Sequence, residues 1–257
     1  MPPPNYRTTV ALSMTTPRMY ASSCELNGKI YVFGGQAVAG SSLGSDVVEV
    51  YDTNSGTWIS KGPMPGVRSE AVCATVGGKI YIIGGSSGGS YFSSVLEYDP
   101  PTDTWIQKAD FPGPGVARGA GAAIGSRIVV TGGDTGTAFL NSVSVYDPNT
   151  DIWASVSPMP TSLSRHAVAV VDGTLLAIGG QDSIGNITGA INQYFPTQDK
   201  WGPYSQLPSP RDAASVATLG GSVYVCGGRM MGGAFPSVDI VERLTLKKTE
   251  LAVMEKQ

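Results

Sequence analysis

Arginine recurs near the start of five successive apolar segments, and it is the side chain best suited to binding carboxylates. Arg118 and Arg165 lie ten residues before the apolar residue that opens the following β-rich run, whereas Arg18, Arg68 and Arg211 lie twelve residues before it. The planar guanidinium fork matches a carboxylate with two parallel hydrogen bonds. This pattern predicts a site for an acidic, extended ligand.

Two sets of loop residues accompany these arginines. The position of Arg118 and Arg165 is filled elsewhere by Tyr20, Glu70 and Ala213, and a second polar set follows five glycine pairs in loops rich in Gly and Ser. Loops carried on a rigid scaffold are common binding surfaces. The expected ligand contacts come from both sets: Tyr20, Glu70, Arg118 and Arg165 from the first, and Gln36, Asp134, Gln181 and Arg229 from the second.

The charge of this expected site is mixed, because Glu70 and Asp134 oppose the arginines. The other three arginines occupy the position two residues earlier within the repeat, and there we expect a structural role in which the side chain bonds loop carbonyls. They are Arg18, Arg68 and Arg211.

Few residues are available for metal or acid–base chemistry. The chain has one histidine, His166, and three cysteines, Cys24, Cys73 and Cys226, with no CxxC spacing. The number and spacing of these residues exclude most metal centres and a disulfide framework. We expect no metal and no cofactor, His166 as a core or rim residue, and the cysteines as small buried hydrophobic side chains.

Composition excludes two kinds of partner. Lys and Arg number 17 against 20 Asp and Glu, a net charge of −3, so a basic footprint for nucleic acid is not expected. No stretch approaches the roughly 18 apolar residues of a membrane span, and Met1–Tyr6 does not resemble a secretory signal. The low charged fraction of 14% and the three thiols predict a cytoplasmic location.

The elements that must position the site repeat along the chain. Five glycine pairs end short apolar runs at intervals of 47–50 residues, and a tyrosine precedes each of the four tryptophans by seven residues. A fixed period of this kind is the signature of a repeat architecture. The pairs are Gly34–Gly35, Gly84–Gly85, Gly132–Gly133, Gly179–Gly180 and Gly227–Gly228, and the aromatic residues are Tyr51 and Trp58, Tyr98 and Trp105, Tyr146 and Trp153, and Tyr194 and Trp201.

Each period contains four short runs of β-branched and aromatic residues between turn signals, with no helical periodicity. This favours an all-β fold in which one period of about 48 residues is a four-stranded propeller blade. The glycine pairs allow close backbone approach that a Cβ would block. The tyrosines and tryptophans are expected to fill the gaps between neighbouring blades.

The repeat resembles the Kelch family. In the first repeat the resemblance is carried by Arg18, Lys29–Gly35, Tyr51–Asp52, Trp58 and Met64–Pro65. Later repeats depart from the pattern: Phe195 replaces the aspartate of repeat four, Val241 and Glu242 replace Tyr-Asp in repeat five, and Lys248 replaces its tryptophan. The resemblance implies a Kelch β-propeller, and arginines at the position of Arg118 and Arg165 hold acidic peptides in Kelch adaptors of ubiquitin ligases.

Five glycine pairs predict a single propeller domain of five blades over residues 1–257, with part of a six-bladed ring as the alternative. The repeats are expected at about 15–64, 65–111, 112–159, 160–207 and 208–257. Residues 1–14 and 249–254 both resemble a fourth strand, and either could close the ring or lie outside it.

The function that follows is a non-catalytic protein-recognition module. We expect it to bind a peptide or protein segment, acidic in character, at the propeller mouth, as a substrate-recognition adaptor does by resemblance. Two alternatives remain: a sugar-processing enzyme similar to bacterial sialic-acid epimerase, using Glu70, Asp134 or His166, and a structural propeller that binds the cytoskeleton through its outer blade faces.

Overall fold

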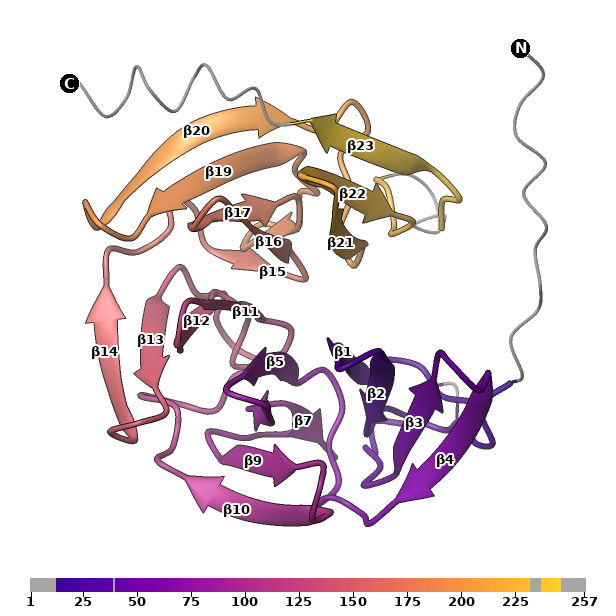
Figure 1. Ribbon diagram of the computed structural model, residues 1–257. Helices are drawn as coiled ribbons and strands as arrows, with labels where there is room; N and C mark the ends of the chain where they lie inside the picture. Colours follow the sequence, from indigo (N-terminus) through magenta and orange to yellow (C-terminus); the bar gives the residue numbers. More distant parts are fainter. Residues whose placement is uncertain (1–12, 39, 232–236, 246–257) are drawn as a thin grey trace.

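Every regular element that the structure describes is a β-strand. The computed structural model describes residues 13–38, 40–231 and 237–245, and their sheets follow one another around a central channel (Figure 1). The predicted all-β, five-bladed propeller is confirmed. Blade 1 is the sheet β1 (Ser22–Leu26), β2 (Lys29–Phe33), β3 (Val48–Asp52) and β4 (Thr57–Lys61), ordered from the channel outward.

Three further blades repeat this antiparallel order. Blade 2 contains β5 (Val72–Val76), β6 (Lys79–Ile83), β9 (Val95–Asp99) and β10 (Thr104–Lys108). Blade 3 contains β11 (Ala120–Ile124), β12 (Arg127–Thr131), β13 (Val143–Asp147) and β14 (Ile152–Val156). Blade 4 contains β16 (Ala167–Val171), β17 (Thr174–Ile178), β19 (Ala190–Phe195) and β20 (Lys200–Gln206).

Blade 5 has three strands in the described ranges: β21 (Ser215–Leu219), β22 (Ser222–Cys226) and β23 (Val241–Thr245). Its predicted fourth strand falls on residues 1–12 or 246–257, which lie outside the described residues. Residues 13 and 14 form no strand. Two small ladders pair β7 (Ser86–Ser87) with β8 (Ser90–Tyr91), and β15 (Leu163–Ser164) with β18 (Gln181–Asp182). The predicted repeat boundaries stay a prediction.

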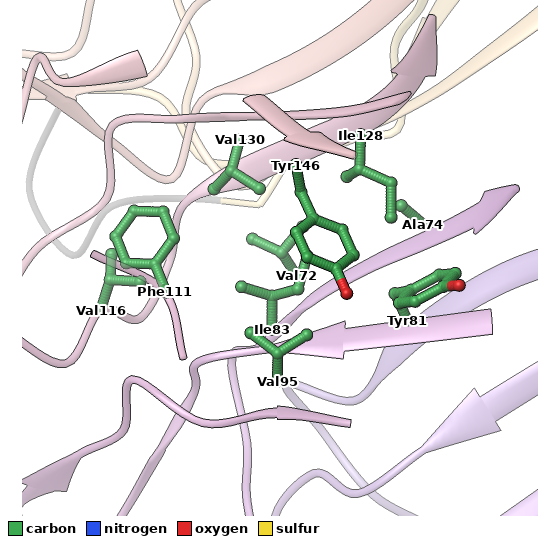
Figure 2. Packing of buried hydrophobic residues seen from close by; sticks show 10 residues of the cluster. All are labelled: Val72, Ala74, Tyr81, Ile83, Val95, Phe111, Val116, Ile128, Val130 and Tyr146. Carbon is green, nitrogen blue, oxygen red and sulfur yellow. The ribbon is translucent and has the colours of Figure 1, made fainter. Parts of the chain in front are cut away.

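The core lies between blades, because the second strand of each blade packs against its neighbours. Figure 2 shows Tyr81 and Ile83 of blade 2 beside Ile128, Val130 and Tyr146 of blade 3, in one buried cluster. Burying side chains of this size stabilises the fold by about 1.5–3 kcal/mol each.

Three of the four repeated Tyr–Trp pairs lie at interfaces between blades, as predicted, whereas Tyr51 and Trp58 of end blade 1 belong to none of the described core clusters. Trp153 packs on Tyr146 with ring centroids 4.9 Å apart and donates its indole N–H to the Ala109 carbonyl of blade 2 at 3.0 Å. Tyr98 and Trp105, and Tyr194 and Trp201, form equivalent pairs at the neighbouring interfaces.

The glycine pairs are required where one blade meets the next. Gly84 has a φ of +66°, and a Cβ there would lie 2.3 Å from the Val116 carbonyl oxygen of blade 3. The next residue, Gly85, donates its N–H to the same carbonyl at 2.8 Å. Equivalent bonds join Gly35 to Arg68, Gly133 to Leu163 and Gly180 to Arg211.

Blades 1 and 5 are the two ends of the series, and they stand apart at the right of Figure 1. Within the described ranges, no backbone bond of the Gly85 type and no apolar cluster joins blade 5 to blade 1. Ile30 of blade 1 is 40% exposed, whereas Ile80 of blade 2 is fully buried at the same position. Val241 of blade 5 is 60% exposed, against 0% for Val95 of blade 2. The end faces are therefore apolar but not covered by one another.

Candidate functional site

The first predicted loop set forms a ring of unusual backbone conformations at one end of the channel. All five residues have a left-handed φ between 51° and 59° without being glycine. Such conformations are uncommon for residues with a Cβ and need a structural reason. The five are Tyr20, Glu70, Arg118, Arg165 and Ala213.

That reason is a chain of hydrogen bonds from blade to blade. The N–H of Glu70 donates to the Tyr20 carbonyl at 2.9 Å, and the N–H of Arg118 donates to the Glu70 carbonyl at 2.9 Å. The chain continues from Arg165 to Arg118 at 2.9 Å and from Ala213 to Arg165 at 2.8 Å. The set therefore follows the channel from blade 1 to blade 5 as a series of four bonds that is open between Ala213 and Tyr20 in the described residues, and we call it the mouth ring.

The second predicted set lies directly beside the mouth ring. In each blade, the residue after the glycine pair forms a β-bridge with the residue that precedes the mouth-ring residue. The bridges are Met19 to Gln36, Ser69 to Ser86, Ala117 to Asp134, Ser164 to Gln181 and Asp212 to Arg229. The structure therefore brings together the two sets that the sequence analysis singled out.

Arg118 is engaged by two carboxylates. Its Nε donates to Glu70 Oε1 at 2.8 Å, and its Nη1 donates to Asp134 Oδ1 at 2.9 Å. Burial opposes the charge of Arg118, but the contacts with Glu70 and Asp134 outweigh burial and raise its pKa. The guanidinium also lies over the ring of Tyr91, 5.9 Å from the centroid. Arg118 is therefore an internal ion-pair partner, which a sequence position alone does not reveal.

Asp134 and Gln36 are buried, so they hold their neighbours in place. Asp134 also accepts a hydrogen bond from Ser164 Oγ at 2.7 Å, in addition to Arg118. Gln36 donates its amide to Ser69 Oγ at 3.2 Å and thereby ties blade 1 to blade 2. Both were expected to contact a ligand, and both are already occupied by protein partners.

Arg165 is different from Arg118, although both occupy the same ring position. Its guanidinium donates from Nη1 to the neutral Gln181 Oε1 at 3.1 Å, and no described carboxylate lies within ion-pair distance. Burial lowers the pKa of Arg165, and the positive charges of Arg118 and Arg229 lower it further, while the more distant carboxylates of Glu70 and Asp212 act in the opposite direction. A half-buried cation held among like charges is a place where an added carboxylate gains the most.

The remaining mouth residues flank Arg165. Arg229 donates Nε to Asp212 Oδ1 at 2.9 Å, and this pairing raises the pKa of Arg229. Tyr20 is 54% exposed at the edge of blade 1. Its phenol lies near the ring, whereas the Gln181 amide is occupied, because Oε1 accepts from Arg165 and Nε2 donates to the Gly185 carbonyl at 3.2 Å.

The three arginines at the position two residues before the mouth ring bond loop carbonyls, as expected. Arg68 is buried and donates to the Gly84 carbonyl at 2.9 Å, and burial lowers its pKa to about 10. Arg18 and Arg211 donate to carbonyls as well and form buried ion pairs with Glu49 and Glu242.

The groups proposed for acid–base chemistry are not free. His166 is buried, its Nε2 lies 2.7 Å from Thr131 Oγ1, and burial lowers its pKa to about 4. No group of three or more metal-ligating side chains occurs in the described part of the chain. The cysteines are half-buried, so the prediction of buried cysteines was wrong in degree: all three lie on strands that are partly open to the channel or to the end faces.

One feature of the mouth was missed by sequence reasoning. The loops that follow the glycine pairs expose large apolar side chains: Val38 and Leu43 in blade 1, Ile184 in blade 4 and Met231 in blade 5. Exposed apolar groups around a polar centre are typical of protein-binding surfaces. The sequence signal that could have revealed this apolar surface was the presence of isolated apolar residues inside Gly-rich loops.

Comparison with known proteins decides the family. The model of the KLHDC2/KLHL20/DRC7 Kelch-repeats domain matches residues 6–180, well over half of the chain. The chain is a member of the Kelch-repeat family. The solved structure of YjhT has the same fold, with a TM-score of 0.80 over 90% of this chain and 82% of that chain at 18% identity.

Curated relatives share part of the chain. Mouse Kelch-like protein 7 is 37% identical over 94 residues, which is 37% of this chain and 16% of that protein. Human Kelch repeat and BTB domain-containing protein 13 is 35% identical over 42% of this chain and 24% of that protein. Beta-scruin of Limulus polyphemus is 27% identical over 40% of this chain and 12% of that protein. The match thus spans less than a quarter of each relative's length. No helix among the described residues has the length and apolarity to cross a membrane.

Proposed function

We propose that this Kelch domain is a non-catalytic module that binds an acidic segment of a protein at the mouth ring. The observation that carries the proposal is the contrast between two equivalent arginines. Arg118 is neutralised by Glu70 and Asp134, whereas Arg165 has no described carboxylate within ion-pair distance, and the charges of Arg118 and Arg229 oppose its own. A ligand carboxylate would supply the missing charge.

The surroundings of Arg165 favour a protein ligand. The exposed apolar loop residues can cover the apolar side chains of an extended segment, while the exposed Tyr20 supplies a polar contact. Arginine is enriched among the few residues that dominate binding at interfaces, where the surrounding contacts exclude water. The Kelch-like relatives, one of which carries a BTB domain by name, support a role as a substrate-recognition adaptor.

The same geometry weighs against the sugar-processing alternative. Glu70 and Asp134 are both bound by Arg118, and His166 is buried and bonded to Thr131. A general acid or base needs a proton that a substrate can reach. We also propose a cytoplasmic location, because the three cysteines are free thiols.

The test compares binding partners of three forms of the protein in lysate of the source cells. Arg165→Ala removes the uncommitted cation, and Arg127→Ala is the matched control. The control residue lies at the β11–β12 turn, at the opposite end of the blade from Thr131 and the mouth, with a side chain that is 61% exposed. Partners identified by mass spectrometry with wild type and Arg127→Ala, but lost with Arg165→Ala, would support recognition at the mouth.

A direct measurement then separates the charge from the shape of the ligand. Peptides from a captured partner are titrated by fluorescence polarisation, with each acidic residue changed to its amide in turn. We expect one Glu→Gln or Asp→Asn change to weaken binding about tenfold or more, as the loss of a charged hydrogen bond does. Partners bound equally by all three proteins would instead direct attention to the outer blade faces, where the cytoskeletal alternative lies.

A further inference from the structure

Two of the three thiols meet at the interface between blades 1 and 2. Cys24 lies on β1 and Cys73 on β5, the two inner strands that run side by side at the channel, and both pack against the same buried cluster. Burial raises the pKa of Cys73 well above its ordinary value, and the neighbouring Cys24 side chain raises it further.

This pairing is particular to one interface. Counted from the mouth ring, Cys24 and Cys73 occupy positions that hold Ala74 with Gly121, Ala122 with Val168, and Ala169 with Val216 at the other interfaces. These are small or apolar residues, and packing there needs no thiol. The third cysteine, Cys226, lies on β22 of blade 5, away from the pair.

One thiol of the pair lies at a cavity that a small oxidant can enter. The inner strands surround a cavity of about 180 Å³ whose lining includes Cys73 of blade 2 and Ser23, the neighbour of Cys24 in blade 1. A molecule of the size of hydrogen peroxide fits such a space.

We propose that Cys24 and Cys73 are a modification site, at which a small peroxide converts the two thiols into a disulfide that joins blade 1 to blade 2. One thiol is oxidised by the peroxide to a sulfenic acid, and one water is released. The sulfur of the second thiol then displaces the sulfenic hydroxyl, which leaves with a proton as a second water. Two thiols are thereby oxidised while one peroxide is reduced to two waters.

The position of the site gives the disulfide a structural effect. Blade 1 is an end blade, and blade 2 is the one blade whose core it shares in the described part of the chain. The disulfide would close a long loop across that single interface, and it would fix the spacing of Tyr20 and Glu70, which lie four and three residues before the two cysteines. Oxidation therefore stabilises the end of the ring that carries part of the mouth.

The test treats the folded protein with hydrogen peroxide, quenches it with an alkylating reagent and counts free thiols by intact mass. We expect the free thiols to fall from three to one, with Cys24 and Cys73 linked in a single cross-linked peptide and Cys226 still alkylated. The thermal midpoint should rise by about 5–10 °C and return on reduction. The reaction should quicken as the pH rises, because the thiolate is the reactive form.

Cys24→Ala and Cys73→Ser each remove one partner, and Ala is the residue that the next three blades carry at the position of Cys24. In either variant, peroxide should leave the thermal midpoint where it was, with folding checked by circular dichroism. Three thiols that all remain free in oxidised, folded wild type would overturn the proposal. A cross-link that involves Cys226, or one that forms only in denaturant, would overturn it equally.

Discussion

Replacing Arg118 by alanine should destabilise the fold far more than the same change at Arg165. The two residues share a ring position, a left-handed φ of 58° and 55°, and a backbone bond to the neighbouring blade. Their side chains differ, because Arg118 alone is bound to carboxylates, Glu70 with a side chain 10% exposed and Asp134 with one 2% exposed. Backbone strain is therefore common to both variants and cancels in the comparison.

The magnitude follows from what each variant leaves behind. Arg118→Ala leaves two poorly solvated carboxylates without their cation, which costs about 3 kcal/mol, a value typical of breaking a buried pair from one side. Arg165→Ala removes one hydrogen bond to Gln181 and also relieves repulsion by Arg118 and Arg229, so its cost stays below about 1 kcal/mol. Arg118→Lys keeps the charge but loses the fork, and should fall between the two.

The assay is urea denaturation followed by tryptophan fluorescence at neutral pH. The four tryptophans lie in blades 1 to 4, so the signal reports on most of the ring. In a parallel thermal scan, the midpoint of unfolding should fall by about 6–12 °C for Arg118→Ala. Equal losses for the two alanine variants, within about 0.5 kcal/mol, would refute the assignment of Arg118 as the internal partner of Glu70 and Asp134.

Three further outcomes are expected from denaturation measurements. His166 has a pKa of about 4 in the fold against 6.5 in the unfolded chain, so the unfolded state binds more protons between these values, and stability should fall by about 2 kcal/mol from pH 6.5 to pH 5. His166→Gln should flatten that slope, and an unchanged slope would contradict the burial of this imidazole. Gly84→Ala should lower the free energy of unfolding by more than about 3 kcal/mol, because its Cβ meets a carbonyl of the next blade. Gly227→Ala should lower it by about 1 kcal/mol, because the atom nearest to its Cβ is 3.4 Å away. Similar losses for the two variants would mean that blade 5 has a covered end face. Ile80→Ala should cost about 2–5 kcal/mol and Ile30→Ala, 40% exposed, about 1 kcal/mol, and a larger effect at Ile30 would show that its face is covered in solution.

The fold could be predicted because its signals are local and repeated. Glycine pairs, tyrosines and tryptophans recur at one interval, and each marks a place where a Cβ would collide or where a gap between blades must be filled. The two kinds of arginine position could also be distinguished from the sequence. The position two residues before the mouth ring holds buried side chains that bond carbonyls, as Arg68 does. The blade number followed from the glycine pairs.

The site could be predicted only as a set of positions. Sequence spacing placed Arg118 and Arg165 at equivalent points but could not distinguish them, because the partners of Arg118 come from blade 2 and from a separate loop of blade 3. The same limit applied to Gln36 and Asp134, which occupy exposed-looking loops and are nevertheless buried. The contact between Cys24 and Cys73 was invisible for the same reason, since 49 residues separate them.

The sequence by itself determined the repeat, the strand order within a blade and the loops that meet at the mouth, because each depends on residues within one period of the chain. Only the tertiary structure decided which arginine is neutralised, which has no described carboxylate within ion-pair distance, and which faces of the end blades are not covered by another described blade. Those outcomes depend on distances between blades, and neighbouring blades bring together side chains that are tens of residues apart in the sequence. The charge that remains at Arg165 is a property of that assembly.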